Sequence, residues 1–129
     1  MQQSFIVLGN GLTDLFEFKA LIDYNHLRIS RIVYFHTPKS QHQRSSVAII
    51  MQPTEGRKFQ AMYMMLNAFK YPYPHTNQKF DLIQSFIEPY DIETVGVDVH
   101  APDDYPELDL YFNYLKSVLR LQHWIPALE

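Results

Sequence analysis

The sequence predicts a single α+β domain with a ferredoxin-like β-α-β-β-α-β core, an antiparallel sheet and an additional C-terminal helix. Three observations lead to this prediction. A chain of 129 residues suits one compact domain. Hydrophobic residues make up 47% of it and aromatic residues 15%, which is enough to build a core without disulfides or metals. Strand-like and helix-like segments also alternate in the required order. We expect the domain to span residues 1–129, and the fold alone implies no activity.

The first two elements are a strand and a helix. Residues 3–9, which contain the apolar run from Phe5 to Leu8, are typical of a buried strand. Thr13 or Asp14 can cap a helix that runs to about Asn25, because their side chains accept the free N–H groups of the first turn. The apolar residues of this helix largely follow the three-four spacing of an amphipathic helix.

The middle of the chain predicts a hairpin and one further segment that fits either a strand or a helix. Residues 28–37 and 45–52 are rich in strand-forming residues, and the polar loop between them favours an antiparallel hairpin. The segment near residues 59–69 fits an extra strand or a helix. Alternation favours the strand, but period alone does not decide the type of so short an apolar run.

The last third predicts a helix, a strand and a final helix. The first helix runs over about residues 76–88, and residues 92–100 form a strand with its valines on one face. The final helix runs over about residues 106–123. It begins at a proline, which suits a first helical position.

Composition excludes several classes of protein. The chain has no cysteine, which excludes disulfides, thiolate nucleophiles and cysteine zinc sites. No stretch approaches the roughly 18 apolar residues of a membrane span. The apolar run before Gly9 covers only Phe5 to Leu8 and lacks a basic lead, so it does not predict a signal peptide. We expect a cytoplasmic protein without a membrane partner.

The charge is unevenly distributed along the chain. Residues 1–70 hold eight Lys or Arg and four Asp or Glu (8 − 4 = +4), whereas residues 71–129 hold three and ten (3 − 10 = −7). Such asymmetry can mark a nucleic-acid face or a contact between opposite charges. The simpler interpretation is that both halves mix their charges in one folded domain.

The sharpest local motif is a glycine turn between the first strand and the first helix. Gly9, Asn10, Gly11 and Asp14 form G-x-G-x-x-D, so a carboxylate occupies the position where a dinucleotide-binding loop has its third glycine. That charge would oppose phosphate at the helix N-terminus. The alternative is a tight turn that needs glycine. These four residues are candidates for ligand binding, and no cofactor is predicted.

A second candidate site combines carboxylates and imidazole. Asp98 and His100 share one strand face, and Asp103, Asp104 and Glu107 follow. These groups can hold a divalent metal, which makes Asp98 and His100 candidate ligands. The spacing is not diagnostic, and the simpler interpretation is a solvated strand face followed by acids that are favoured at a helix N-terminus.

Two basic loops give a candidate nucleic-acid surface. Lys39 and Arg44 lie in or next to the first hairpin loop, and Arg57 and Lys58 lie in the second. Basic loops beside sheet aromatics are typical of RNA-binding sheets, although the aromatic-glycine signature of those domains is absent. The alternative is a pair of ordinary solvated loops.

The sequence contains no recognisable catalytic motif. A serine elbow G-x-S-x-G and a phosphate loop G-x-x-x-x-G-K-[ST] are both absent. The histidines are scattered over loops and element ends. We therefore assign no catalytic residue and do not expect an enzyme.

The final predicted helix is apolar on most of its sides. Tyr111, Leu115 and Val118 line one stripe, and further apolar residues widen it. Such a helix either crosses the sheet or lies between protomers. The three residues are candidates for an interface, which predicts a homo-oligomer or a protein partner.

Three stretches resemble a family of short, uncharacterised bacterial proteins. They are LGNGLTDLFEF (residues 8–18), FDLI (80–83) and LRLQHWIP (119–126). Some members of that family carry the label methylthioribose kinase. The present residues do not support the label, because they lack a phosphate-binding loop and a kinase Asp/Asn pair and are too few for two lobes. The resemblance implies a cytoplasmic bacterial protein and brings no known catalytic residues.

Together these observations favour a non-catalytic binding or regulatory module that acts through self-association or a protein partner. One alternative is a small-ligand binder or small enzyme with its site at the turn from Gly9 to Asp14. The other is RNA binding through Lys39, Arg44, Arg57 and Lys58.

Overall fold

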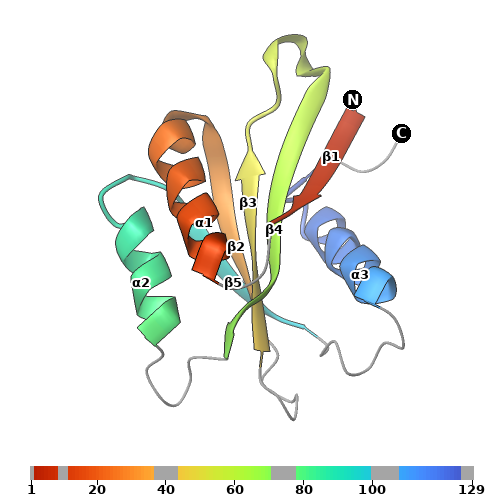
Figure 1. The fold of residues 1–129 in the computed structure, drawn as a ribbon. Coiled ribbons are helices and arrows are strands. Elements are labelled where there is room, and N and C mark those ends of the chain that lie inside the picture. The colour runs from red at the N-terminus through yellow and green to blue at the C-terminus, as the bar shows by residue number, and fades with distance from the viewer. Residues whose placement is uncertain (1, 9–11, 37–43, 71–77, 100–107, 126–129) are drawn as a thin grey trace.

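The structure, a computed structural model, describes residues 2–8, 12–36, 44–70, 78–99 and 108–125 (Figure 1). These residues form a mixed α+β arrangement in which one five-stranded sheet has helices on both faces. The elements in chain order are β1 (Gln2–Val7), α1 (Leu12–Asn25), the short helix η1 (His26–Arg28), β2 (Ile29–His36), β3 (Arg44–Met51), the short helix η2 (Glu55–Arg57), β4 (Phe59–Lys70), α2 (Gln78–Ile87), β5 (Thr94–Asp98) and α3 (Leu108–Leu121).

Each predicted helix and strand is present. The segment near residues 59–69, whose sequence fits either a strand or a helix, is the strand β4. The expected antiparallel sheet is wrong. The strand order is β1-β4-β3-β2-β5, with β1–β4 and β2–β5 parallel and only the two pairs involving β3 antiparallel. This order does not confirm the ferredoxin-like arrangement. The reason is β4, whose 12 residues lie between β1 and β3 and leave β1 at the edge.

The connections explain why α1 and α2 lie on the same face. The β1-α1-β2 and β4-α2-β5 units both join parallel strands and both cross the sheet in the same direction. Crossovers of this kind are almost always right-handed, so both helices must cover one face. Figure 1 shows α1 and α2 together on that face and α3 on the other. We call these the α1 face and the α3 face.

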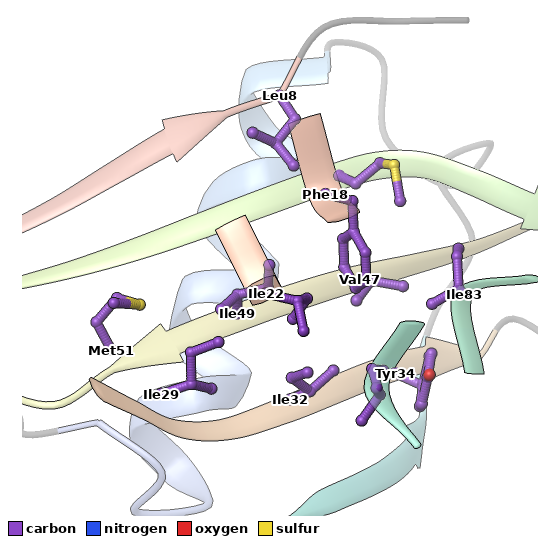
Figure 2. Packing of buried hydrophobic residues seen from close by; sticks show 12 residues of the cluster. Leu8, Phe18, Ile22, Ile29, Ile32, Tyr34, Val47, Ile49, Met51 and Ile83 are labelled. Carbon is purple, nitrogen blue, oxygen red and sulfur yellow. The ribbon is translucent and has the colours of Figure 1, made fainter. Parts of the chain in front are cut away.

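The core on the α1 face is built from one side of α1 and the central strands. Phe18 and Ile22 of α1 are fully buried and belong to one cluster with Ile32, Val47 and Ile49 of the sheet (Figure 2). Burial of a large apolar side chain contributes about 1.5–3 kcal/mol. Their i, i+4 spacing brings both side chains of α1 onto the sheet.

The core on the α3 face is supplied by a single helix. Tyr111, Leu115 and Leu119 recur every four residues on α3 and are all buried against the sheet. The Tyr111 hydroxyl lies 3.3 Å from Ser46 Oγ of β3, so this polar tip has a hydrogen-bond partner inside the core.

The turn from β3 to β4 needs a glycine. Gly56 has a φ of +76°, a conformation that side chains disfavour. Thr54 closes the turn, since the Phe59 N–H donates to Thr54 Oγ1 at 3.1 Å. The turn therefore directs β4 back along β3, which puts Lys58 at the end of the sheet remote from Arg44.

Candidate functional site

Four parallel strands end at one edge of the sheet. β1, β2, β4 and β5 run in the same direction, so their last residues, Val7, His36, Lys70 and Asp98, mark a common carboxyl edge. Ligands of open α/β sheets bind outside such an edge. The topology therefore makes it the first place to look for the predicted sites.

The glycine turn follows β1 in the chain, but Gly9, Asn10 and Gly11 lie outside the described residues. α1 begins at Leu12, so Asp14 lies inside the first turn and not before it, where a capping residue is expected. The side chain of Asp14 lies outside what the structure describes. Ligand binding at this turn stays a prediction.

The predicted metal pair is described only in part. Asp98 ends β5 and is exposed, and His100 lies outside the described residues. Among the residues that the structure describes, no three His, Asp or Glu side chains gather closely enough to hold a metal ion.

His36 is the histidine that the structure places near Asp98. Its Nδ1 lies 3.2 Å from Ser45 Oγ, and its ring lies parallel to that of Tyr34 with centroids 6.1 Å apart. A Cβ at Gly96 would lie only 3.2 Å from His36 Nε2, so glycine at this position makes room for the imidazole. Neighbouring strands β2, β3 and β5 thus converge on this ring.

The chemistry of this cluster favours a neutral imidazole. Burial lowers the pKa of His36, and the nearby Asp98 carboxylate partly opposes that shift. Ser45 is fully buried, so its hydroxyl cannot present a nucleophile to a substrate in solution. The geometry can orient an imidazole but gives no arrangement for covalent catalysis.

The three candidate nucleic-acid residues that the structure describes lie at two different ends of the sheet. Arg44 starts β3 next to the carboxyl edge, whereas Arg57 and Lys58 lie beyond the other end of that strand. An eight-residue strand spans about 26 Å. Lys39 lies outside the described residues, and so do the side chains of Arg44 and Arg57.

The predicted interface residues of α3 face the chain's own sheet. Tyr111 and Leu115 are buried, and Val118 is half-buried against the same cluster. A charge at Tyr111 or Leu115 would therefore disturb folding before it could report on a partner.

Sequence reasoning missed an exposed apolar stripe on α1. Phe16 is 75% exposed and Tyr24 is 87% exposed, and with Ala20 they follow i, i+4, i+8 spacing. Leu27 of η1, 83% exposed, extends the stripe. The same helix buries Phe18 and Ile22 on its other side, so α1 is apolar towards the sheet and towards solvent.

A groove of about 330 Å³ runs beside this stripe. Its lining comes from α1 and from the sheet next to the β1 edge: Leu8, Glu17, Ala20, Leu21, Tyr24, Asn25 and Tyr63. Ile6 of β1 pairs with Tyr63 of β4 in register and is 39% exposed. We define the α1–β1 surface as Ile6, Leu8, Phe16, Ala20, Tyr24 and Tyr63.

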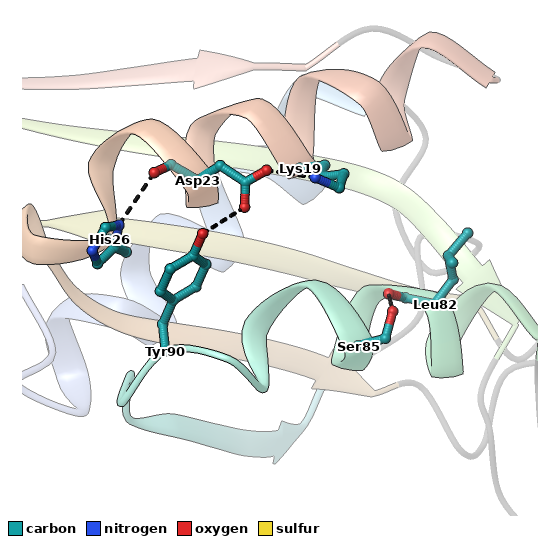
Figure 3. Close-up of polar contacts among 6 residues, drawn as sticks. All are labelled: Lys19, Asp23, His26, Leu82, Ser85 and Tyr90. Carbon is teal, nitrogen blue, oxygen red and sulfur yellow. Dashed lines mark hydrogen bonds and ion pairs between the residues drawn. The ribbon is translucent and has the colours of Figure 1, made fainter.

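Polar contacts hold the C-terminal half of α1 in place. The Tyr90 hydroxyl donates to Asp23 at 2.8 Å, and Lys19 donates to the other oxygen of the same carboxylate (Figure 3). The hydrogen bond from Lys19, followed by that from Tyr90, lowers the pKa of Asp23. The Tyr90 ring also stacks on His26, with centroids 4.2 Å apart. These contacts fix the orientation in which α1 presents its outer stripe.

Comparison with other proteins gives a family without an assigned activity. Among the described residues, no helix is long and apolar enough to cross a membrane. Searches among curated proteins and among solved structures find no match. A family described as a domain of unknown function, DUF7147, matches residues 1–125. The chain therefore belongs to the DUF7147 family, whose match covers every helix and strand that the structure describes.

Proposed function

We propose that this chain is a non-catalytic, cytoplasmic binding module that acts through self-association or a protein partner at its α1–β1 surface. The observation that carries the proposal is the exposed stripe of Phe16, Ala20 and Tyr24 beside an apolar groove. An isolated exposed apolar residue needs no explanation. A contiguous apolar area is typical of an interaction site.

The composition of the surface supports a protein as the bound molecule. Tyrosine and phenylalanine are enriched in the cores of protein interfaces, where they bury large areas with few rotatable bonds. Phe16 and Tyr24 supply such side chains, and Glu17 and Asn25 give the groove a polar border. This arrangement matches an apolar interface centre with a polar rim.

A second candidate function is the binding of a small ligand at the carboxyl edge. It is supported by His36, whose imidazole lies where β2, β3 and β5 meet and beside Asp98. RNA binding has less support, since the two basic loops lie at opposite ends of β3.

Native mass spectrometry tests the leading proposal. Protein purified gently from its own host should carry a stoichiometric second polypeptide, either another copy or a different chain. The double variant Phe16→Glu/Tyr24→Glu should lose that added mass while its melting temperature stays near the wild-type value. Leu121→Glu on α3, where the wild-type side chain is 76% exposed, is the matched control and should keep it.

Two results would contradict the proposal. One is a wild-type protein that is a bare monomer at every concentration tested. The other is a folded double variant that retains its partner. A discrete small mass on the wild type would instead support the ligand site near His36.

A further inference from the structure

The two edge strands of the sheet differ in their protection against pairing with another strand. β5 has five residues, contains Gly96 and ends in the charged Asp98. β1 has six residues, QQSFIV, with no charge, no proline and no glycine. Edge strands are usually protected by charges, proline or bulges, because their unpaired backbone groups can pair with strands of other molecules. The residues of β1 itself provide none of these protections, although Lys116 and Arg120 of α3 lie near the Phe5 ring.

The hydrogen bonds of β1 show which of its residues face the outer edge. The Gln2 N–H donates to Lys58 O at 3.0 Å, and the Leu8 N–H donates to Met64 O at 2.9 Å. Successive residues of a strand turn their backbone groups to opposite edges. The even-numbered residues therefore bond towards β4, and Phe5 and Val7 direct N–H and C=O outward.

We infer that a second copy of this chain pairs its β1 antiparallel with this β1, about a twofold axis at Phe5. The inference rests on the proposed function and specifies its partner. At the axis, Phe5 of one copy and Phe5 of the other exchange both backbone hydrogen bonds. Two five-stranded sheets become one sheet of ten strands.

Charge and surface favour a second copy over a different protein. When two copies of one strand pair about a twofold axis, any charged residue comes close to the same residue of the other copy and is repelled. A strand without charged residues, such as β1, therefore suits self-pairing. A twofold axis through the sheet keeps the α1 faces of both copies on the same side. The apolar groove beside Tyr63 and Ile6 then continues across the axis into that of the partner.

The inferred register predicts which side chains meet. With Phe5 on the axis, Ser4 lies opposite Ile6 of the partner in a pair without backbone hydrogen bonds. The Cα atoms of such a pair are about 4.5 Å apart, which suits a disulfide. Two residues of the same type at position 4 or at position 6 lie diagonally, about 7–8 Å apart.

Proline at position 7 provides the first test. Val7→Pro removes an outward N–H and leaves the β1–β4 hydrogen bonds intact, as is tolerated on an edge strand. Sedimentation equilibrium of the purified protein should show a wild-type dimer and a Val7→Pro dissociation constant raised about tenfold or more. Val7→Ala keeps the N–H and should remain largely dimeric. Circular dichroism melting checks that each variant folds.

Cysteine pairs provide the second test, because the natural chain contains no thiol. Under mild oxidation, an equimolar mixture of Ser4→Cys and Ile6→Cys proteins should form the mixed disulfide far in excess of the roughly twofold advantage over each homodimer that random pairing gives. Yields at the random ratio would overturn the register. A monomeric wild type, or a Val7→Pro protein as dimeric as the wild type, would overturn the pairing itself.

The salt dependence of binding distinguishes a second copy of the chain from an acidic partner strand. On the α3 face, Lys116 Nζ lies 4.8 Å from the Phe5 ring centroid, so the twofold axis brings two like charges near each other. Added salt screens them and should leave the dimer as tight or make it tighter. Binding that weakens with salt would instead indicate an acidic partner. A recombinant monomer that captures such a partner would refute the self-pairing and leave the proposed function standing.

Discussion

Helices α1 and α3 each have 14 residues, yet they differ in how they place their aromatic side chains. α3 is alone on its face of the sheet and buries Tyr111 and Leu115 completely. α1 shares its face with α2, buries Phe18 and leaves Phe16 and Tyr24 in solvent. The difference teaches that a helix rich in apolar residues need not be the one at an interface. What matters is how much of its apolar surface the sheet can cover.

The largest effect is expected at Leu115, which is fully buried. Leu115→Ala should lower the free energy of unfolding by about 2–5 kcal/mol, because it removes buried methyl groups and leaves a cavity. Urea denaturation followed by circular dichroism measures this loss. A change in the free energy of unfolding below about 1 kcal/mol would show that α3 does not form the core of its face. The contrast between α1 and α3 would then not hold.

A smaller effect is expected at Lys116 on the outer side of α3. Its ammonium lies 4.1 Å from the ring centroid of Phe112, and burial lowers its pKa. Lys116→Ala should lower the free energy of unfolding by about 0.5–1 kcal/mol, the typical contribution of an exposed cation–π contact. Lys19 of α1 offers a weaker case, because its ammonium lies 5.9 Å from the Phe86 ring centroid and also pairs with Asp23 in solvent, and Lys19→Ala should cost less.

The α1 face should also respond to pH through His36. Burial lowers the pKa of His36 in the folded chain, so protons bind more readily to the unfolded chain, whose histidine pKa is about 6.5. Stability from this group is complete at high pH and declines as pH falls through about 6.5.

The variant His36→Gln should remove this contribution. Its melting temperature should vary less than that of the wild type between about pH 7.5 and pH 5.5. A parallel pH profile for His36→Gln and the wild type would refute the role of the half-buried imidazole.

The smallest effect on stability is expected at Phe16. Phe16→Ala should change the free energy of unfolding by less than about 0.5 kcal/mol, because the side chain is largely in solvent. Association measured by sedimentation should nevertheless weaken. A loss of more than about 2 kcal/mol would mean that α1 buries both of its sides, which removes the contrast with α3.

The sequence predicted the elements well and their pairing poorly, for a physical reason. Apolar periodicity is local, so it located α1, α2, α3 and every described strand. Strand pairing depends on residues far apart, and Gln2 pairs with Phe59. The periodicity of α1 likewise could not decide which of its apolar sides would face the sheet.

The candidate sites show the same division between local and distant information. The approximate start of α1 could be predicted, because it depends on adjacent residues. The cluster around His36 could not, since Ser45, Gly96 and Asp98 reach it from two other strands. The alternation of Ile32, Tyr34 and His36 on one face of β2 was the only available signal.

The edge position of β1 has a consequence for folding order. β2, β3 and β4 are consecutive antiparallel neighbours and can form from nearby residues, whereas β1 must find a partner 57 positions away (59 − 2 = 57). Local pairings generally form before distant ones. We therefore expect β4 to pair with β3 first and to leave its other edge unpaired until β1 adds to the sheet. In a concentrated solution the arriving strand can come from another molecule, which would give intertwined dimers by domain swapping.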